Sequence, residues 1–116
     1  MITVSKKTQE QFFIRDGDKC HFVKLNDIYL VKVEGNYVRL FFGNTKAFLA
    51  RSLSYVEEKL SESHFFRANR QEIINLNYIQ SMEPAINDGL LVFLKDGSEV
   101  EVSRRQAKEL KQRLEF

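Results

Sequence analysis

The stretch "HFFRANRQEIINLNYI", residues 64–79, places a short polar segment between two apolar ones. Two phenylalanines precede the polar segment, and isoleucine, leucine and tyrosine side chains follow it. Side chains of these types are often buried, so both flanks are expected to enter the core. Arg67, Asn69 and Arg70 lie between the flanks, and we expect the loop that presents them to be firmly anchored at both ends.

The residues of this polar segment leave two interpretations open. Arginine can bond guanine through two hydrogen bonds, and asparagine can do the same with adenine, so the segment suits base recognition. In the other interpretation the loop is structural, and its arginines pair with Glu62 or Glu72. The residues alone slightly favour the structural loop.

The composition is that of a single soluble globular domain. The chain has 116 residues, of which 43% are hydrophobic and 29% are charged. No apolar run is long enough to span a membrane, and the first ten residues lack the apolar stretch of a signal peptide. The single cysteine, Cys20, excludes an internal disulfide, so we expect a cytoplasmic protein. A net charge of +2 permits nucleic-acid binding without requiring it.

Strand signals dominate the chain. Apolar segments rich in β-branched and aromatic residues alternate with short turn sequences, which is typical of antiparallel hairpins. The expected turns are Asp16-Gly17, Glu34-Gly35-Asn36, Gly43-Asn44-Thr45 and Asp96-Gly97, with Asp88-Gly89 at the start of the last hairpin. Residues 98–103, "SEVEVS", alternate strictly and predict a strand with one face in solvent.

Two segments show helical spacing of their apolar residues, residues 52–63 and residues 103–116. The apolar faces are Leu53, Val56 and Leu60 in the first segment and Ala107, Leu110 and Leu114 in the second, with Ser52 and Ser103 as N-caps. We therefore predict a mostly β fold of the α+β class. It has antiparallel strands, one mid-chain helix and a short C-terminal helix over residues 9–116, and residues 1–8 are a leader or linker remnant.

No catalytic or metal-binding constellation is visible in the sequence. His21 and His64 are the only histidines, and no cysteine or carboxylate lies near either one at a metal-ligand spacing. Cys20 has no neighbour in sequence that would stabilise a thiolate. We therefore expect no catalytic residues, no metal and no cofactor, and we do not expect an enzyme.

Basic residues lie at the expected start of the C-terminal helix. Arg104 and Arg105 follow Ser103, although cations at a helix N-terminus are mildly unfavourable. Free backbone N–H groups at the same end favour anions, so a phosphate or a nucleic-acid groove would fit there. The alternative is a solubilising pair whose side chains bend away.

Four other residues are weaker candidates for contact with a nucleic acid. Asn36 and Tyr37 lie at a hairpin tip, while Lys46 and Arg51 flank the next strand. Lysine and arginine in such positions commonly hold backbone phosphates. Taken singly, each of the four is more simply a surface or packing residue.

Four segments follow one another in an order that identifies a family. They are "IYLVKVEGNYVRL", "FLARSLSYVEEKL", "FFRANRQEIINLNYIQSME" and "GLLVFLKDGSEVEVSRRQAKELKQRL". The most specific parts are F-x-R-x-x-R at residues 65–70, I-N-x-x-Y-I at residues 74–79, and the hairpin that leads into V-S-R-R at residues 102–105. Together these segments resemble the LytTR domain, a bacterial DNA-binding module, over about residues 9–114.

The resemblance implies that loops, and not a recognition helix, enter the DNA. The segments that match are the tip around Asn36, Tyr37 and Val38, the "RANR" loop, and "SRRQ" at residues 103–106. The positions that match base contacts are Val38, Arg70 and Arg105, with Asn69 and Arg104 as contributing neighbours. Arg70 and Arg105 would read successive major grooves, while Arg104, Lys46 and Arg51 would hold phosphates.

Four positions in or beside these segments bear on how the DNA would be recognised. Many family members have histidine where Asn69 stands and serine or threonine where Gln71 stands, so the recognised sequence is not predictable. Val38 can offer only an apolar contact, for instance to a thymine methyl. We expect Arg67 to brace the loop through a carboxylate or a backbone carbonyl.

The resemblance also implies partners. The chain is expected to bind double-stranded promoter DNA as a bacterial transcriptional regulator, with two copies on paired repeats. Such domains commonly follow the receiver domain of a two-component response regulator or another sensory domain. The alternative is a small β-rich module that binds a protein or an RNA.

Overall fold

The computed structural model describes residues 11–60 and 64–115. Its strands are β1 (Gln11–Asp16), β2 (Lys19–Lys24), β3 (Ile28–Glu34), β4 (Tyr37–Phe42), β5 (Thr45–Leu49), β6 (Phe65–Arg67), β7 (Glu72–Asn75), β8 (Ile79–Pro84), β9 (Leu90–Leu94) and β10 (Glu99–Val102). Its α-helices are α2 (Leu53–Lys59) and α3 (Arg104–Leu114), and its 3-10 turns are η1 (Leu25–Asp27), η2 (Leu76–Tyr78) and η3 (Ile86–Asp88). The predicted class, antiparallel sheet with two helices, is confirmed. No helix in the described ranges is both long enough and apolar enough to cross a membrane.

The central element is a five-stranded antiparallel sheet with the order β5-β4-β3-β7-β6. β3 lies in the middle, where Val31 pairs with Leu40 of β4 and Leu30 pairs with Ile74 of β7. Hairpins form around each of the four predicted turn sequences, since β1–β2, β3–β4, β4–β5 and β9–β10 are all antiparallel neighbours. Local turn chemistry therefore determines these four connections.

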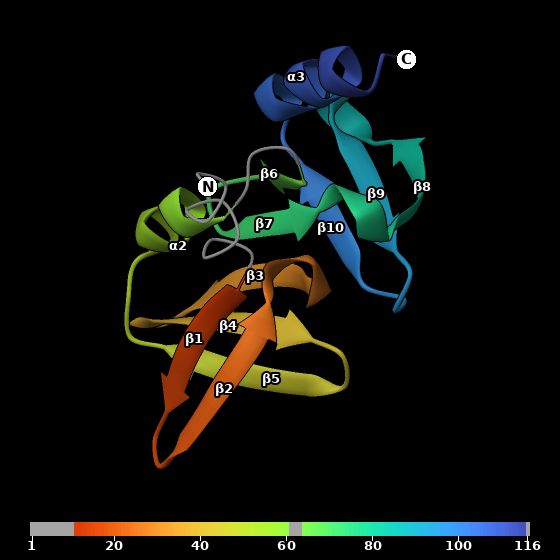
Figure 1. Cartoon of the computed structure of the whole chain (residues 1–116). Helices are drawn as coiled ribbons and strands as arrows, with labels where there is room; N and C mark the ends of the chain where they lie inside the picture. The colour runs from red at the N-terminus through yellow and green to blue at the C-terminus, as the bar shows by residue number, and fades with distance from the viewer. Residues whose placement is uncertain (1–10, 61–63, 116) are drawn as a thin grey trace, which may run out of the picture.

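The central sheet separates two hydrophobic cores, because successive side chains of a strand point to opposite faces. Phe65 and Ile73 belong to the first core, whereas their neighbours Phe66 and Ile74 belong to the second. Figure 1 shows the β1–β2 hairpin on one side of the sheet and α3 with β8–β10 on the other. Residues 64–79 thus contribute side chains to both cores from two short strands, β6 and β7.

The first core lies between the central sheet, the β1–β2 hairpin and α2. Ile14 of β1 is fully buried, and Leu53 and Val56 anchor α2. The predicted N-cap is confirmed, because the Ser52 hydroxyl accepts a hydrogen bond from the Tyr55 N–H at 3.0 Å. α2 ends before the predicted boundary, since Leu60 already has extended backbone, and residues 61–63 lie outside the described part.

The second core is closed by the three-stranded sheet β10-β9-β8 and by α3. The alternation predicted for "SEVEVS" is confirmed, with Val100 and Val102 buried and the glutamates between them exposed. Ala107 and Leu110 of α3 are buried, but the helix ends at Leu114, which is 38% exposed and therefore largely outside the core. Ser103 occupies the N-cap, yet its side chain makes no capping hydrogen bond.

Two irregular features complete the second core. A β-bulge between Ile28 and Leu30 places Tyr29 and Leu30, which are adjacent in sequence, in the same core. At the β8–β9 connection, a Cβ on Gly89 would lie 2.8 Å from the carbonyl oxygen of Val102, so only glycine fits this close approach. The connection is therefore held against the end of β10, next to the start of α3.

Asn75, the asparagine of the I-N-x-x-Y-I motif, has a structural role. It is fully buried, and its amide donates to the carbonyl oxygens of Asn26 (3.1 Å) and Ile28 (2.9 Å). Its side-chain oxygen accepts a hydrogen bond from the Asn77 N–H at 2.9 Å. A buried amide with these partners satisfies polar groups where β7 leaves the sheet.

Candidate nucleic-acid interface

One end of the central sheet brings together three segments that are far apart in sequence. We call them the tip (residues 34–37), the polar turn (residues 68–71) and the start of α3 (residues 103–106). The Val33 N–H donates to the Gln71 carbonyl at 2.9 Å, so the tip and the polar turn leave the sheet side by side. The Ser103 N–H donates to the Ala68 carbonyl at 3.2 Å, which joins the start of α3 to the same turn. These are the three segments that the sequence predicts to approach DNA.

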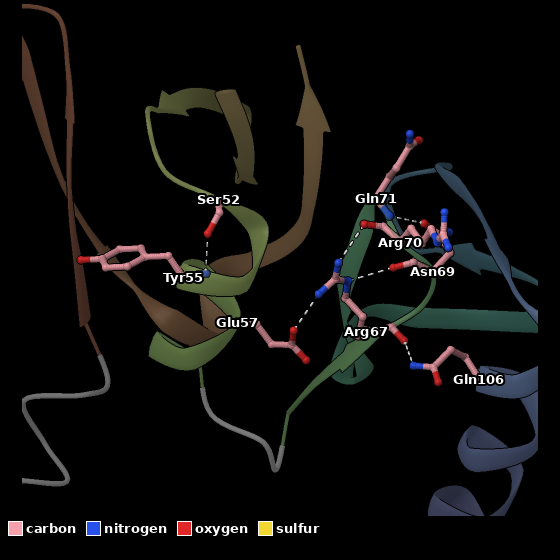
Figure 2. A network of polar contacts seen from close by, with 8 residues as sticks. All are labelled: Ser52, Tyr55, Glu57, Arg67, Asn69, Arg70, Gln71 and Gln106. Carbon is pink, nitrogen blue, oxygen red and sulfur yellow. Dashed lines mark hydrogen bonds and ion pairs between the residues drawn. The ribbon is translucent and has the colours of Figure 1, made fainter. Parts of the chain in front are cut away.

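Arg67 braces the polar turn, as expected. Its Nε donates to the Asn69 carbonyl at 2.9 Å, and its Nη2 donates to the Arg70 carbonyl at 2.8 Å. Its Nη1 forms an ion pair with Glu57 of α2 at 2.8 Å (Figure 2). The carboxylate partner is therefore Glu57, and not Glu72 as the sequence suggested. The other suggested partner, at position 62, lies outside the described residues.

Asn69 also belongs to this brace. Its amide nitrogen donates to Glu72 Oε1 at 3.0 Å and to the Glu101 carbonyl at 2.6 Å. Its oxygen accepts a hydrogen bond from the Gln71 N–H at 2.8 Å. Both amide donors and the oxygen are engaged within the protein, which gives Asn69 a structural role. Its expected contribution to base reading stays a prediction.

Gln106 and Glu57 are the residues that sequence reasoning missed. The Gln106 Nε2 donates to the Arg67 carbonyl at 2.6 Å, so α3 is also joined to the residue that precedes the polar turn (Figure 2). Glu57 looks like an ordinary solvated residue of a helix, and its contact with Arg67 depends on how α2 packs. The "SRRQ" match gives some signal for Gln106, whereas no sequence signal points to Glu57.

Arg70 and Arg105 are both exposed and line one open hollow, together with Arg67, Asn69, Gln71, Ser103 and Gln106. These two side chains therefore lie close together at this end of the molecule. The expectation that they read successive major grooves stays a prediction.

The tip presents Asn36 and Tyr37, but not Val38. Asn36 is exposed. Tyr37 is 50% exposed, and its ring lies edge-on to Phe48, with ring centroids 6.1 Å apart. Val38 is 1% exposed and packs in the first core, because alternation along β4 directs it inward with Leu40. The expected contact of Val38 with a thymine methyl is therefore not available in this fold.

The two remaining candidates lie in different places. Lys46 pairs with Phe41, near the β4–β5 turn and away from the tip at the other end of β4. Arg51 follows β5 on the tip side, and its guanidinium lies over the Tyr55 ring, 4.7 Å from the centroid. The structure thus brings Arg51 near the tip but leaves Lys46 apart from the three segments.

Exposed arginines gather at this end of the molecule, around two neighbouring hollows. The described residues form two ion pairs, Arg39–Glu34 and Arg67–Glu57. Neither pair involves the exposed arginines of the interface, which are Arg70, Arg104 and Arg105. A neighbouring hollow is lined by Glu72, Glu101, Arg104 and the η3 turn, where Ile86 is 82% exposed. The side of Arg70 and Arg105 is therefore the one suited to a polyanion.

No group of three or more histidine, cysteine, aspartate or glutamate residues in the described ranges could hold a metal ion. Among the described residues, the one titratable group with a clearly shifted pKa is Tyr29, in the second core. Burial, with a smaller contribution from Asp96, raises the pKa of its phenol. Tyr29 does not line the hollow of Arg70 and Arg105.

The sequence and the fold are similar to those of known proteins. The model of the LytTr DNA-binding domain family matches residues 18–115. The chain is 36% identical over 101 residues to the sensory transduction protein LytT of Enterococcus faecalis, covering 87% of this chain and 42% of that protein. It is 32% identical over 107 residues to the transcriptional regulatory protein YpdB of Escherichia coli K12, covering 84% of this chain and 44% of that protein.

A solved structure, a LytTr DNA-binding domain from Bacillus cereus, has the same fold. It superposes with a TM-score of 0.84 at 20% identity and covers 92% of this chain and 98% of that one. The chain spans less than half the length of the two curated relatives. Because the family model covers most of the chain, the protein belongs to the family of LytTr DNA-binding domains.

Proposed function

We propose that the chain binds double-stranded DNA sequence-specifically through the tip, the polar turn and the start of α3. The observation that carries this proposal is the shared hollow of Arg70 and Arg105. Both arginines are exposed, and neither takes part in the two ion pairs of the described residues. Arginine is the side chain best suited to bidentate contacts with guanine, so we assign base reading to these two.

The proposed site consists of loops and a helix start, and each part has a separate role. Arg104 and the first turn of α3 hold phosphates, since a helix N-terminus carries partial positive charge. Asn36 and Tyr37 contact the duplex from the tip, and Arg51 supports them from the end of β5. Lys46 is at most a peripheral phosphate contact because of its position near the β4–β5 turn.

The braced polar turn favours sequence-specific binding over nonspecific electrostatic binding. Ala68 is fully buried, and Arg67, Asn69 and Gln106 hold the turn by hydrogen bonds before any ligand arrives. A side chain that extends from a preorganised turn loses less conformational freedom on binding. Arg70 is therefore offered to a base edge at a defined position.

We further propose that the chain is the DNA-binding part of a bacterial transcriptional regulator that works in the cytoplasm. Relatives named sensory transduction protein and transcriptional regulatory protein are more than twice as long as the matched region. A receiver domain or another sensory domain would supply the signal, and two copies would bind paired repeats. Pairing is expected because one small module makes few base contacts and has limited specificity.

The proposal is tested by titrating a duplex selected from a random pool with Arg70→Ala and Arg105→Ala. Each variant should bind about 5–150-fold more weakly, which corresponds to about 1–3 kcal/mol for a bidentate base contact. Both side chains are exposed, so thermal unfolding should be unchanged.

Lys19→Ala is the matched control, because it removes one exposed positive charge from the β1–β2 turn. Figure 1 shows that turn at the bottom of the molecule and α3 at the top. The control should bind within about twofold of the parent protein, as expected for a screened, distant charge. Parental affinity in both arginine variants would overturn the proposed function.

A further inference from the structure

We propose that Glu57 of α2 is a positioning residue of the DNA-binding surface, although it is an acidic residue that touches no DNA. It orients the guanidinium of Arg67, and Arg67 in turn fixes the backbone that presents Arg70. This proposal rests on the proposed function of the polar turn. It makes α2, which contributes no base contact, part of the recognition apparatus.

The geometry forms a chain of contacts from the first core to the polar turn. Val56 is fully buried in the first core, so the backbone of its neighbour Glu57 is held in place. Glu57 Oε1 lies 2.8 Å from Arg67 Nη1 (Figure 2). The Nε and Nη2 atoms of the same guanidinium donate to the carbonyl oxygens of Asn69 and Arg70.

Glu57 selects one orientation of a side chain that would otherwise have several. The guanidinium is planar, so a carboxylate on one nitrogen fixes the directions of the other donors. The two backbone carbonyls are neutral acceptors, whereas the Glu57 carboxylate forms a charge-assisted hydrogen bond, which is the stronger type. Loss of Glu57 should therefore loosen both contacts between Arg67 and the polar turn.

Global stability should depend little on this ion pair. The side chains of Arg67 and Glu57 are 26% and 47% exposed, and partly exposed pairs contribute little to folding. The proposed effect is local, on the mean position and mobility of residues 68–71. A role in DNA binding can therefore be separated from a role in folding.

Simple electrostatics predicts the opposite effect on DNA binding. Removing an acidic side chain from a protein that binds a polyanion should strengthen binding. Glu58, the next residue of α2, is exposed and takes part in neither ion pair of the described residues. Glu57→Ala and Glu58→Ala make the same charge change at adjacent positions, so they form a matched pair.

The decisive experiment compares these two variants on the selected duplex and on a scrambled duplex. Glu58→Ala should bind the selected duplex as tightly as the parent or up to about twofold more tightly. Glu57→Ala should bind it about 3–10-fold more weakly, while both variants should bind the scrambled duplex at least as well as the parent. Glu57→Gln keeps an acceptor for Arg67 and should fall between Glu57→Ala and the parent.

Two further measurements identify the route through Arg67. If Glu57 acts only through Arg67, then Arg67→Ala and the double variant Glu57→Ala/Arg67→Ala should bind the selected duplex equally. Amide exchange at residues 68–71 should be faster in Glu57→Ala than in Glu58→Ala, with unfolding midpoints unchanged. Additive losses in the double variant would contradict the proposed route.

The outcome separates this proposal from the proposed function. If Glu57→Ala binds the selected duplex as tightly as Glu58→Ala does, the positioning role is overturned, whereas weak binding by Arg70→Ala would still support the proposed DNA site. If Arg70→Ala and Arg105→Ala both bind like the parent, the proposed function itself fails. In that case Glu57 has no DNA-binding surface to position.

Discussion

The tip and the polar turn reach the same end of the molecule, but their shapes are determined in different ways. The tip depends on its own backbone, because Gly35 has φ +60°, a conformation that suits glycine. None of residues 68–71, all of them described, has a positive φ. The polar turn is instead held by side chains of Arg67, Asn69 and Gln106, whose bonds connect it with α2, β10 and α3. A turn of the first kind is a local property, whereas a turn of the second kind depends on the whole fold.

Asn69→Ala, in the polar turn, is expected to have the largest effect on stability and DNA binding. The change removes three hydrogen bonds and leaves the Glu101 carbonyl and the Gln71 N–H without these partners. We expect an unfolding free energy about 1–3 kcal/mol lower, with specific DNA binding weakened about tenfold. Urea denaturation and duplex titration measure the two quantities.

Asn44→Ala, an exposed asparagine of the β4–β5 turn, is the control for Asn69→Ala and should change neither quantity appreciably. If Asn69 instead reads an adenine, the loss of affinity would be confined to duplexes that carry one particular base pair. Stability would then stay at the parental value, and the distinction between the two turns would fail.

A smaller effect, confined to the tip, is expected from Gly35→Ala. A Cβ at Gly35 would have no atom within 4 Å, so the cost is only that of a left-handed backbone for alanine. We expect a loss of about 1 kcal/mol in the free energy of unfolding and about threefold weaker DNA binding. Thermal or urea unfolding and the same titration measure both.

Gly43→Ala is the matched control for the tip, because Gly43 has φ +58° and equally open surroundings in the β4–β5 turn. It should lose a similar amount of stability while keeping parental DNA affinity. Equal losses of affinity in both glycine variants would show that the tip has no special role in binding.

The smallest effect is expected from Lys46→Ala. Lys46 is exposed and lies near the β4–β5 turn, so it contributes only long-range attraction to DNA. Affinity for the selected duplex should stay within about twofold of the parent, with a salt dependence of affinity that is nearly unchanged. A clear decrease in that slope would place Lys46 on a phosphate and extend the interface along β5.

Much of the fold could be predicted because its determinants are local. Gly17, Gly35, Gly43 and Gly97 all have positive φ at the turns where the sequence predicts hairpins. The buried position of Val38 was also within reach of the sequence. The segment "YVRLFF" alternates, so Val38 should share a face with Leu40, and that pattern is a better guide than the matched position in the family.

Other features could not be predicted because they depend on tertiary packing. Alternation along "FFR" places Phe65 and Phe66 on opposite faces, but it does not show what covers the face of Phe66, since the second core is built mainly by residues that follow in the chain. The Glu57–Arg67 pair joins a helix to a strand whose relative positions are set by the first core. The proximity of Arg70 to Arg105 likewise requires β10 to end beside the polar turn.

The two-sided central sheet has a consequence for how the domain unfolds. β3 and β7 contribute side chains to both cores, so loss of either core exposes one face of strands that the other core still needs. The β1–β2 hairpin and the β8–β10 sheet have backbone hydrogen bonds of their own, but each buries its apolar face in a core that it shares with the central sheet. We therefore expect one cooperative transition, in which α3 and the β1–β2 hairpin are lost together although they lie on opposite faces of the sheet.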